Sequence, residues 1–207
     1  MSRIEPLDPE KTQGKTRELL AAIKAKSGRV PNILKTMAHS SVALQAYLGL
    51  SGAFADAKLP LKVREQIALA VGEDNQCHYC VAAHSAIGKL SGLTPEEIEA
   101  GRRGGSHFPS KDSKVNGTSP GNLQSEENGG QGRSGDPKTD AILRFAKRLS
   151  ANRGNITDPE LAEVRKAGCS DEEILEIVTA VALNLFTNYV NHVADTAIDF
   201  PQVPPLV

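Results

Sequence analysis

The sequence predicts an all-α protein, a bundle of amphipathic helices, on the basis of three observations. Apolar residues recur at helical spacing along most of the 207-residue chain, and no window shows a sustained alternating β pattern. Aromatic residues make up only 4% of the chain, with no Trp, and Ala is abundant, which suits close helix packing better than a β-sandwich. Polar capping residues, often followed by Pro or Glu, mark several helix starts.

The N-terminal half is predicted to contain six helices separated by Gly, Pro or capping residues. Leu19, Leu20 and Ile23 share one side of the first helix, and Gly72 is expected to end the fourth. The predicted segments are residues 11–26, a helix begun by Pro31, residues 41–57, residues 61–71, a cysteine-containing helix capped by Asp74 or Asn75 that runs to about Leu90, and a helix begun by Thr94-Pro95-Glu96-Glu97.

The C-terminal half is predicted to contain three more helices and an extended tail. Residues 174–186 are apolar on nearly all sides, and this pattern predicts a central buried helix. The helix starts are Asp136-Pro137, Thr157-Asp158-Pro159-Glu160 and Ser170-Asp171-Glu172-Glu173, and the tail contains Val203-Pro204-Pro205.

Residues 104–135 differ abruptly in composition from the rest of the chain. They hold eight of the eighteen Gly, many Ser and Asn, and only Phe108, Val115 and Leu123 as large apolar residues. Such a stretch cannot bury enough apolar surface to offset its ordering entropy, which predicts a flexible insertion and favours a solvated linker over a binding loop. We otherwise expect a single domain over residues 1–207.

The charge balance and the hydropathy argue against two classes of partner. Lys plus Arg number 24 and Asp plus Glu number 25, so no strong net field would recruit nucleic acid or an anionic membrane surface. No run of eighteen apolar residues is present, and residues 1–6 lack the apolar core of a signal peptide. We therefore expect a cytoplasmic protein with no membrane segment.

A weak internal similarity emerges when the cysteine region is shifted by 108 positions along the chain. The shift aligns Glu65 with Glu173, His84 with His192, Cys80 with Asn188 and Cys77 with Leu185. Two interpretations remain open. The second segment is a degenerate duplicate that has lost its chemistry, or the similarity is due to chance, since the identities are few.

The most informative segment of the sequence runs from Cys77 to His84. Three cysteines are an odd number, which argues against a disulfide framework, and two cysteines three residues apart indicate redox chemistry or metal binding. Because each residue of a helix turns by about 100°, Cys77, Cys80 and His84 would share one face. Cysteines at this spacing can close a disulfide with little backbone movement.

The chemistry of this segment depends on where its helix begins. The N-terminal end of a helix favours thiolate, at Cys77 more strongly than at Cys80. His84 lies one turn past Cys80 and can take or supply a proton. Glu65 precedes Cys77 by twelve residues, so it could reach the same face and orient His84 if the two helices pack antiparallel.

Three other interpretations of the cysteine pair are less favoured. A zinc ion would need four ligands, so Cys169 or His107 would have to complete a set with Cys77, Cys80 and His84, and no metal is expected. Haem attachment is excluded because a valine, not a histidine, follows the second cysteine. Two unreactive buried cysteines are the third interpretation, weakened by the polar residues around them.

Five further residues receive structural interpretations. Cys169, alone beside a helix start, is expected to be a packing residue, and His39 a surface or capping group. His78 would face away from the Cys80 side of the helix, and Tyr79 would pack or donate a hydrogen bond nearby. For His192, a satisfied core or interface histidine is favoured over a functional one.

The pattern Glu65-x11-Cys77-x2-Cys80-x3-His84 resembles the alkylhydroperoxidase D-like branch of the carboxymuconolactone decarboxylase superfamily. The match extends upstream to Val30-Pro31-Asn32 and downstream to Asn191-His192-Val193-Ala194-Asp195-Thr196. It covers nearly the whole chain except the Gly- and Ser-rich stretch. The combined Glu, Cys-x-x-Cys and His pattern is fairly specific, whereas Cys-x-x-Cys alone is not.

The resemblance implies an all-helical bundle with an internal pseudo-repeat, assembled as a homo-oligomer, a trimer or a hexamer. It implies hydroperoxide reduction, in which the Cys80 thiolate attacks and becomes a sulfenic acid and Cys77 closes the disulfide. Glu65 and His84 would relay protons. An external dithiol, a lipoyl group or a thioredoxin-like protein, would re-reduce the pair, and no metal, haem or flavin cofactor is implied.

Two departures and two alternatives accompany the resemblance. The helix dipole favours Cys77 as the more acidic sulfur, but we expect Cys80 to attack because a general base one turn away outweighs a partial charge.

Tyr79 stands where the type enzyme has a histidine, so a relay role at this position is in doubt. The alternatives are a lactone decarboxylase of the same superfamily, whose branch generally lacks the redox pair, and a non-enzymatic redox or zinc module.

Overall fold

The computed structural model describes residues 2–105 and 136–206, and within them the protein is all-α, as the sequence predicts. A 3₁₀ turn at Pro9–Lys11 precedes nine helices, and these residues contain no strand. The predicted insertion at 104–135 lies outside the described residues apart from its first two glycines. The helices are α1 (Gly14–Ser27), α2 (Asn32–Met37), α3 (Ser41–Phe54), α4 (Leu61–Asp74), α5 (His78–Leu90), α6 (Pro95–Arg103), α7 (Pro137–Ala151), α8 (Asp158–Lys166) and α9 (Asp171–Ala194).

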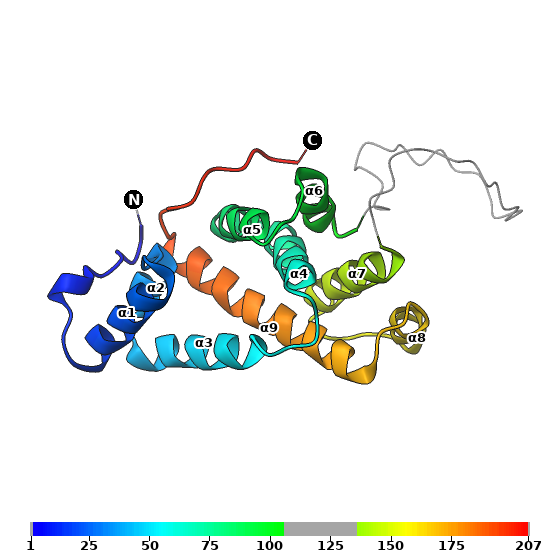
Figure 1. The fold of residues 1–207 in the computed structure, drawn as a ribbon, viewed down its shortest axis with the longest axis horizontal. Coiled ribbons are helices and arrows are strands. Elements are labelled where there is room, and N and C mark those ends of the chain that lie inside the picture. The colour runs from blue at the N-terminus through cyan, green and yellow to red at the C-terminus, as the bar shows by residue number, and fades with distance from the viewer. Residues whose placement is uncertain (1, 106–135, 207) are drawn as a thin grey trace, which may run out of the picture.

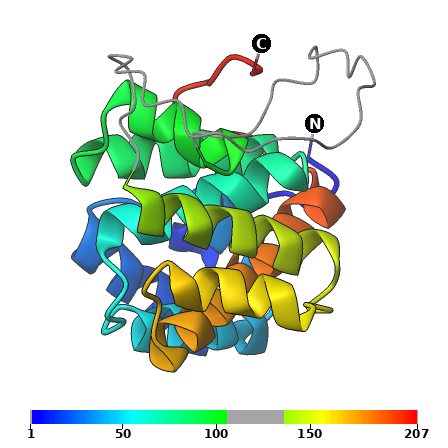
Figure 2. The same ribbon diagram turned by 90° about the vertical axis from the view of Figure 1, so that its right-hand side faces the viewer.

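Two helices, α4 and α9, form the centre of the bundle. α9 crosses the middle of the molecule and contacts α2, α3, α4, α5 and α7 (Figure 1). α4 contacts α5, α6 and α7 as well as α9. α1 to α3 lie toward one end, and at the other end α6, α7 and α8 occupy successive levels (Figure 2). The larger apolar cluster is built from side chains of α4, α7, α8 and α9, so the core lies between the two central helices.

Three of the predicted helix starts are capping boxes in the structure, at Thr94, Thr157 and Ser170. In each box the hydroxyl oxygen accepts the backbone N–H of the Glu three residues on, and that Glu carboxylate accepts the backbone N–H of the cap. Loss of an N-cap side chain typically costs about 1 kcal/mol, because it leaves an N–H group of the first turn unpaired. These local signals explain why α6, α8 and α9 begin where the sequence predicts.

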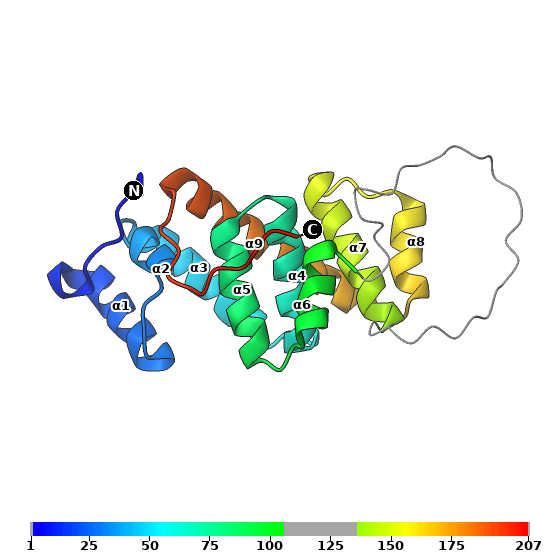
Figure 3. The same cartoon turned by 90° about the horizontal axis from the view of Figure 1, so that it is seen from above.

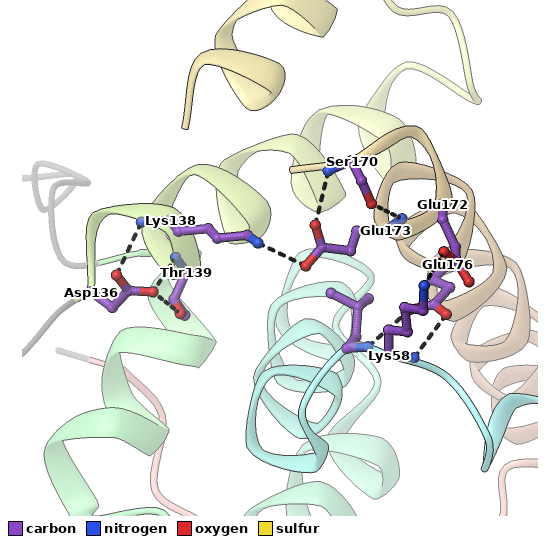
Figure 4. Close-up of polar contacts among 9 residues, drawn as sticks. Lys58, Asp136, Lys138, Thr139, Ser170, Glu172, Glu173 and Glu176 are labelled. Carbon is purple, nitrogen blue, oxygen red and sulfur yellow. Dashed lines mark hydrogen bonds and ion pairs between the residues drawn. The ribbon is translucent and has the colours of Figure 1, made fainter. Parts of the chain in front are cut away.

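Polar contacts at the start of α9 tie this helix to two other elements (Figure 4). The carboxylate of Glu176 accepts the backbone N–H groups of Lys58 and Leu59 at 2.8 and 2.9 Å. The Nζ of Lys138, on α7, donates to Oε1 of Glu173 at 2.7 Å. These contacts hold the start of α9 against the loop that precedes α4 and against α7.

α9 is longer than the sequence predicts and is not buried on all sides. Within the predicted run 174–186, Leu175 and Val178 are 66 and 40% exposed, so the prediction of a buried helix is wrong for one face. The exposed side continues beyond that run at Tyr189 and Val193, which are 59 and 65% exposed. By length and composition alone, α9 could cross a membrane, and it is the one helix within the described residues that passes this test. Its contacts with five other helices are those of a core helix.

The internal similarity does not correspond to a repeated helix hairpin. A turn at residues 75–77 separates α4 from α5, whereas the aligned residues 183–185 lie inside the continuous helix α9. The aligned segments therefore follow different backbone paths. Two aligned positions nevertheless meet in space, because the side chain of Asn188 contacts its counterpart Cys80.

The segment that follows α9 returns along the helices that carry the cysteines (Figures 1 and 3). The Asp199 carboxylate accepts a hydrogen bond from the Arg29 guanidinium at 2.8 Å and another from the backbone N–H of Asn32 at 3.1 Å. The same guanidinium lies over the ring of Phe200, 4.4 Å from its centroid. Residues before α2 are thus joined to residues after α9.

Candidate active site

The two cysteines lie at a tight turn between α4 and α5. The predicted end of α4 at Gly72 is wrong, because the helix runs to Asp74 and has Asn75 as its C-cap. Gln76 then adopts a left-handed conformation with φ 56°, and the backbone N–H of Cys77 donates to the carbonyl of Gly72 at 2.8 Å. This bond closes the turn and reverses the chain direction.

Cys77 is itself the N-cap of α5, in place of the predicted Asp74 or Asn75. Its Sγ accepts the backbone N–H of Cys80 at 3.4 Å. Asp74 and Asn75 cannot cap α5 because both belong to the end of α4, where the Asn75 amide donates to the carbonyl of Val71 at 2.8 Å. Cys77 therefore stands one position before the helix and Cys80 in its first turn.

Both sulfurs are enclosed by several segments of the chain. Cys77 and Cys80 are 1 and 2% exposed, and neither forms a disulfide. Ile33 from α2 and Phe200 from the C-terminal segment pack against them. On the α4 side, a Cβ on Gly72 would lie 3.4 Å from the Cβ of Cys80, so the glycine allows the two helices to approach closely. A bulky reagent can reach this pair only when one of these covers moves.

Two asparagine side chains from α9 point their amide nitrogens at the sulfurs. Nδ2 of Asn188 lies 3.0 Å from Sγ of Cys80. Nδ2 of Asn191 lies 3.2 Å from Sγ of Cys80 and 3.8 Å from Sγ of Cys77. The sequence analysis gave neither asparagine a role. One feature of the sequence could have indicated them, because two asparagines stand three residues apart in a largely apolar helix.

The electrostatics of the pair favour one negative charge rather than two. The pKa of Cys77 is lowered, chiefly by the hydrogen bond from the Cys80 thiol, and burial opposes this effect only in part. The pKa of Cys80 is raised by that same hydrogen bond and by burial, against the amides of Asn191 and Asn188, which lower it. The two shifts place the lower pKa on Cys77, and a charge on either sulfur opposes ionisation of the other.

Glu65 and His84 meet beside the cysteine pair because α4 and α5 run antiparallel. Nδ1 of His84 lies 2.8 Å from Oε2 of Glu65, the contact that the sequence analysis anticipated. Burial alone would lower the pKa of His84, but the charge and hydrogen bond of Glu65, with a contribution from Cys77, raise it above its ordinary value of 6.5. The ring can therefore hold a proton near neutral pH, next to a carboxylate that orients it.

Tyr79 is directed away from the proton pair. Its hydroxyl donates to the Asp199 carboxylate at 2.7 Å and accepts the backbone N–H of Ile33 at 3.2 Å. Burial, followed by the hydrogen bond to Asp199, raises the pKa of Tyr79, so the phenol keeps its proton. Its ring meets Phe200 edge to face, with centroids 5.7 Å apart. Tyr79 thus holds the covering segments in place.

Tyr47, on α3, is a further residue that the sequence analysis placed only by its helical spacing. Burial raises the pKa of its hydroxyl, a hydrogen bond with Ser51 lowers it, and the charges of Glu65 and Cys80 raise it. Those two charges act on Tyr47 because it lies near the site. No motif in the sequence joins α3 to the cysteine segment.

The other residues singled out from the sequence lie outside this group. Cys169 is buried in the larger apolar cluster, which fits the predicted packing role. His39 lies 2.9 Å from the Glu5 carbonyl, and His78 is exposed. His192 is also exposed, so the prediction of a core histidine is wrong, while the interface interpretation stays a prediction.

The described residues contain no group of three His, Cys, Asp or Glu side chains placed to hold a metal ion. His107, considered as a zinc ligand, lies outside the described residues. A cavity of about 940 Å³ lies between α5, α6 and the C-terminal segment, but its lining includes neither cysteine. The candidate site is therefore an enclosed cluster around the sulfurs rather than this cavity.

We predict that replacing Glu65 by Gln lowers the pKa of His84. The substitution removes the charge that raises this pKa and leaves the burial that lowers it. The measurement is an NMR titration of the His84 ring protons. Glu73→Gln is the matched control, since Glu73 lies on the same helix but pairs with Arg102. An unchanged His84 titration in Glu65→Gln would contradict the assignment.

We also predict that Phe200→Ala increases the rate at which a thiol reagent such as iodoacetamide labels Cys77 and Cys80. The ring packs against the cluster that contains both cysteines and Tyr79, so its loss should open a path to the sulfurs. Ile198→Ala is the control, because Ile198 is 40% exposed and belongs to the same segment without packing against the pair. Equal labelling rates in the two variants would show that Phe200 does not limit access.

Part of the chain matches a known family, and the whole fold matches solved structures. Residues 43–105, which span α3 to α6, match the family model described as the carboxymuconolactone decarboxylase family. An alkylhydroperoxidase core, a peroxidase-related protein from Ralstonia eutropha, is 22% identical with a TM-score of 0.72, and the match covers 96% of this chain and 92% of that one. No curated protein sequence matches the chain.

Two further structures have the same fold. A peroxidase-related protein from a Silicibacter species is 22% identical with a TM-score of 0.67, over 94% of this chain and 91% of that one. A debrominase determined in complex with 2,3,4-tribromopyrrole is 19% identical with a TM-score of 0.69, over 95% and 91% of the two chains. The region that matches the carboxymuconolactone decarboxylase family model holds Glu65, both paired cysteines and His84, and the chain has the fold of the alkylhydroperoxidase core.

Proposed function

We propose that the protein is a thiol peroxidase, which reduces hydroperoxides through a dithiol and disulfide cycle of Cys77 and Cys80. The observation that carries this proposal is the placement of both buried sulfurs at the start of α5, near a partly buried carboxylate and histidine pair. Such a pair needs no cofactor to transfer two electrons. The family match over residues 43–105 and the peroxidase-related neighbours support an enzyme of this general type.

The hydrogen bond between the two sulfurs reconciles the low pKa of Cys77 with an attack by Cys80. When the pair is singly ionised, the lower pKa of Cys77 places the charge on Cys77 and the proton on Cys80. Transfer of that proton to Cys77 leaves the thiolate on Cys80, which faces the two amides of α9. Cys77 is then the neutral thiol that the second step requires.

In the first chemical step the Cys80 thiolate attacks the terminal oxygen of the hydroperoxide. An S–O bond forms, the O–O bond breaks, and the sulfur becomes a sulfenic acid. The alkoxide that leaves takes the proton held by His84, which Glu65 keeps in place. Sulfur is oxidised by two electrons and the peroxide is reduced to an alcohol.

In the second step the Cys77 sulfur displaces the hydroxyl group from Cys80. The disulfide forms and the hydroxyl leaves as water with the Cys77 proton. An external dithiol, of the lipoyl or thioredoxin-like class, then reduces the disulfide and is itself oxidised. Because Phe200 and Ile33 cover the sulfurs, this donor must displace part of the cover. A cytoplasmic location fits this scheme, since cytosolic reductants regenerate dithiols.

The proposal predicts that Cys80→Ser abolishes hydroperoxide consumption and leaves the fold intact. Cys77→Ser should consume one equivalent and stop with a sulfenic acid on Cys80, which dimedone trapping and mass spectrometry would locate. Cys169→Ser is the control, because Cys169 packs in the distant apolar cluster. Sulfenic acid on Cys77 in the Cys80→Ser protein would reverse the two roles.

Assays of turnover, metal content and bromide release would distinguish the thiol peroxidase from other possible activities. A lactone decarboxylase would retain turnover after both cysteines are alkylated, whereas the thiol peroxidase would not. Stoichiometric zinc in the purified protein, or a disulfide that forms without turnover, would instead indicate a redox or zinc module. Loss of bromide from 2,3,4-tribromopyrrole, the ligand of the debrominase neighbour, would indicate a reductive dehalogenase that uses the same dithiol.

We also propose that the chain forms a homo-oligomer, a trimer or a hexamer. Leu175, Val178, Tyr189 and Val193 lie within about 60° of one another around α9, on one exposed side of the helix. Exposed apolar stripes of this kind are typical of surfaces that pack against another chain. A second copy of the same protein is the occupant that the family resemblance favours.

The oligomer proposal predicts that Val193→Glu reduces the mass measured by light scattering toward the 22.0 kDa of one chain. The buried carboxylate would lose its hydration in a subunit interface. Val42→Glu is the control, since Val42 is 74% exposed on a different helix, α3. A parent protein that is already monomeric would refute the proposal outright.

A further inference from the structure

Four observations single out Asn188 and Asn191 on α9. Both amides converge on one sulfur, with nitrogen distances of 3.0 and 3.2 Å to Sγ of Cys80. Both side chains are buried, at 0 and 4% exposure. Both Oδ1 atoms are buried without a hydrogen-bond partner among the described residues. Within the described residues, the hydrogen bonds of the two amide groups all go to the two sulfurs.

An unpaired buried amide oxygen destabilises a fold, and an apolar side chain of the same shape would avoid this cost. Two such oxygens lie on one face of a helix whose other buried positions are largely apolar. The pair would have little structural benefit if the sulfur stayed neutral, because a neutral thiol is a weak acceptor. A thiolate is a much stronger acceptor, and hydrogen bonds to charged groups contribute about twice as much as neutral ones.

We propose that Asn188 and Asn191 bind the Cys80 thiolate through their amide N–H groups and so select Cys80, rather than Cys77, as the attacking sulfur. This inference rests on the proposed function for its attack step, but the binding of the thiolate does not. Without the two amides, the remaining influences on Cys80 are burial and its neighbour Cys77, and both oppose ionisation. The amides thus act on a reacting atom from a helix that carries neither the cysteines nor the Glu65 and His84 pair.

α9 also supplies a matched control at Asn184, one turn before Asn188. Asn184 is 6% exposed and shares the buried side of the helix. Its Nδ2 donates to the carbonyl of Ala180 at 2.8 Å, within its own helix, rather than to a sulfur. Asn184→Leu therefore changes a buried amide on the same helix without removing a donor from Cys80.

The test isolates Cys80 as the one remaining thiol in a Cys77→Ser/Cys169→Ser protein. The start of α5 is retained in this background, because serine is a favourable N-cap residue. Thiolate is measured by its ultraviolet absorbance as pH is varied. The titratable groups around Cys80 are then His84 on α5, Glu65 on α4 and Tyr47 on α3, and these stay constant across the variants.

We expect Asn188→Leu and Asn191→Leu each to reduce the thiolate fraction of Cys80 near neutral pH by about tenfold, the loss of one hydrogen bond to a charged group. Their melting temperatures should equal or exceed that of the parent, because an unpaired buried oxygen is removed. Asn184→Leu should leave the thiolate titration unchanged. The inference is overturned if both sulfur-facing variants titrate like the parent, or if Asn184→Leu shifts the titration equally.

A second measurement needs no substitution on α9. The side-chain NH₂ resonances of Asn188 and Asn191 should shift with the same midpoint as the Cys80 absorbance, and those of Asn184 should not. Independent midpoints would overturn the inference even if the leucine variants failed to fold. If the parent consumes no hydroperoxide but these responses are seen, the proposed function fails and thiolate binding by α9 stands.

Discussion

The site depends on the hydrogen bond from the Cys77 N–H to the Gly72 carbonyl, which closes the turn between α4 and α5. This turn makes the two helices antiparallel and brings them close enough for Gly72 to contact the first turn of α5. Glu65, near the start of α4, then meets His84 in the middle of α5. The same reversal presents both sulfurs to α9, so one backbone constraint assembles the proton pair and the thiols together.

Much of the fold could be predicted because its signals are local. Capping hydroxyls at Thr94, Thr157 and Ser170 satisfy N–H groups within their own helices, so no distant partner is needed to place those starts. The N-cap of α5 was mispredicted because Asp74 and Asn75 can either end α4 or begin α5. The local sequence does not decide between these two positions, and tertiary packing does. Burial of α9 was overestimated, since an apolar side chain can lie on an exposed face as well as on the core face of a helix.

The motif residues of the site were predictable from spacing, whereas their partners were not. A helix repeat places Cys80 and His84 on one face, but nothing in the local sequence brings α9 to that face. Asn188 and Asn191 therefore had no visible role until the chain was folded. The division of charge between two sulfurs likewise depends on their shared hydrogen bond and on burial, which are tertiary properties.

The links among Arg29, Asn32, Asp199 and Phe200 have a consequence for how the protein is made. Most of the residues that cover the cysteines belong to opposite ends of the described chain, and Phe200 is synthesised about 120 residues after Cys80. During translation, the thiols must therefore remain uncovered, and open to adventitious oxidation, until the ribosome has released the segment that closes over them.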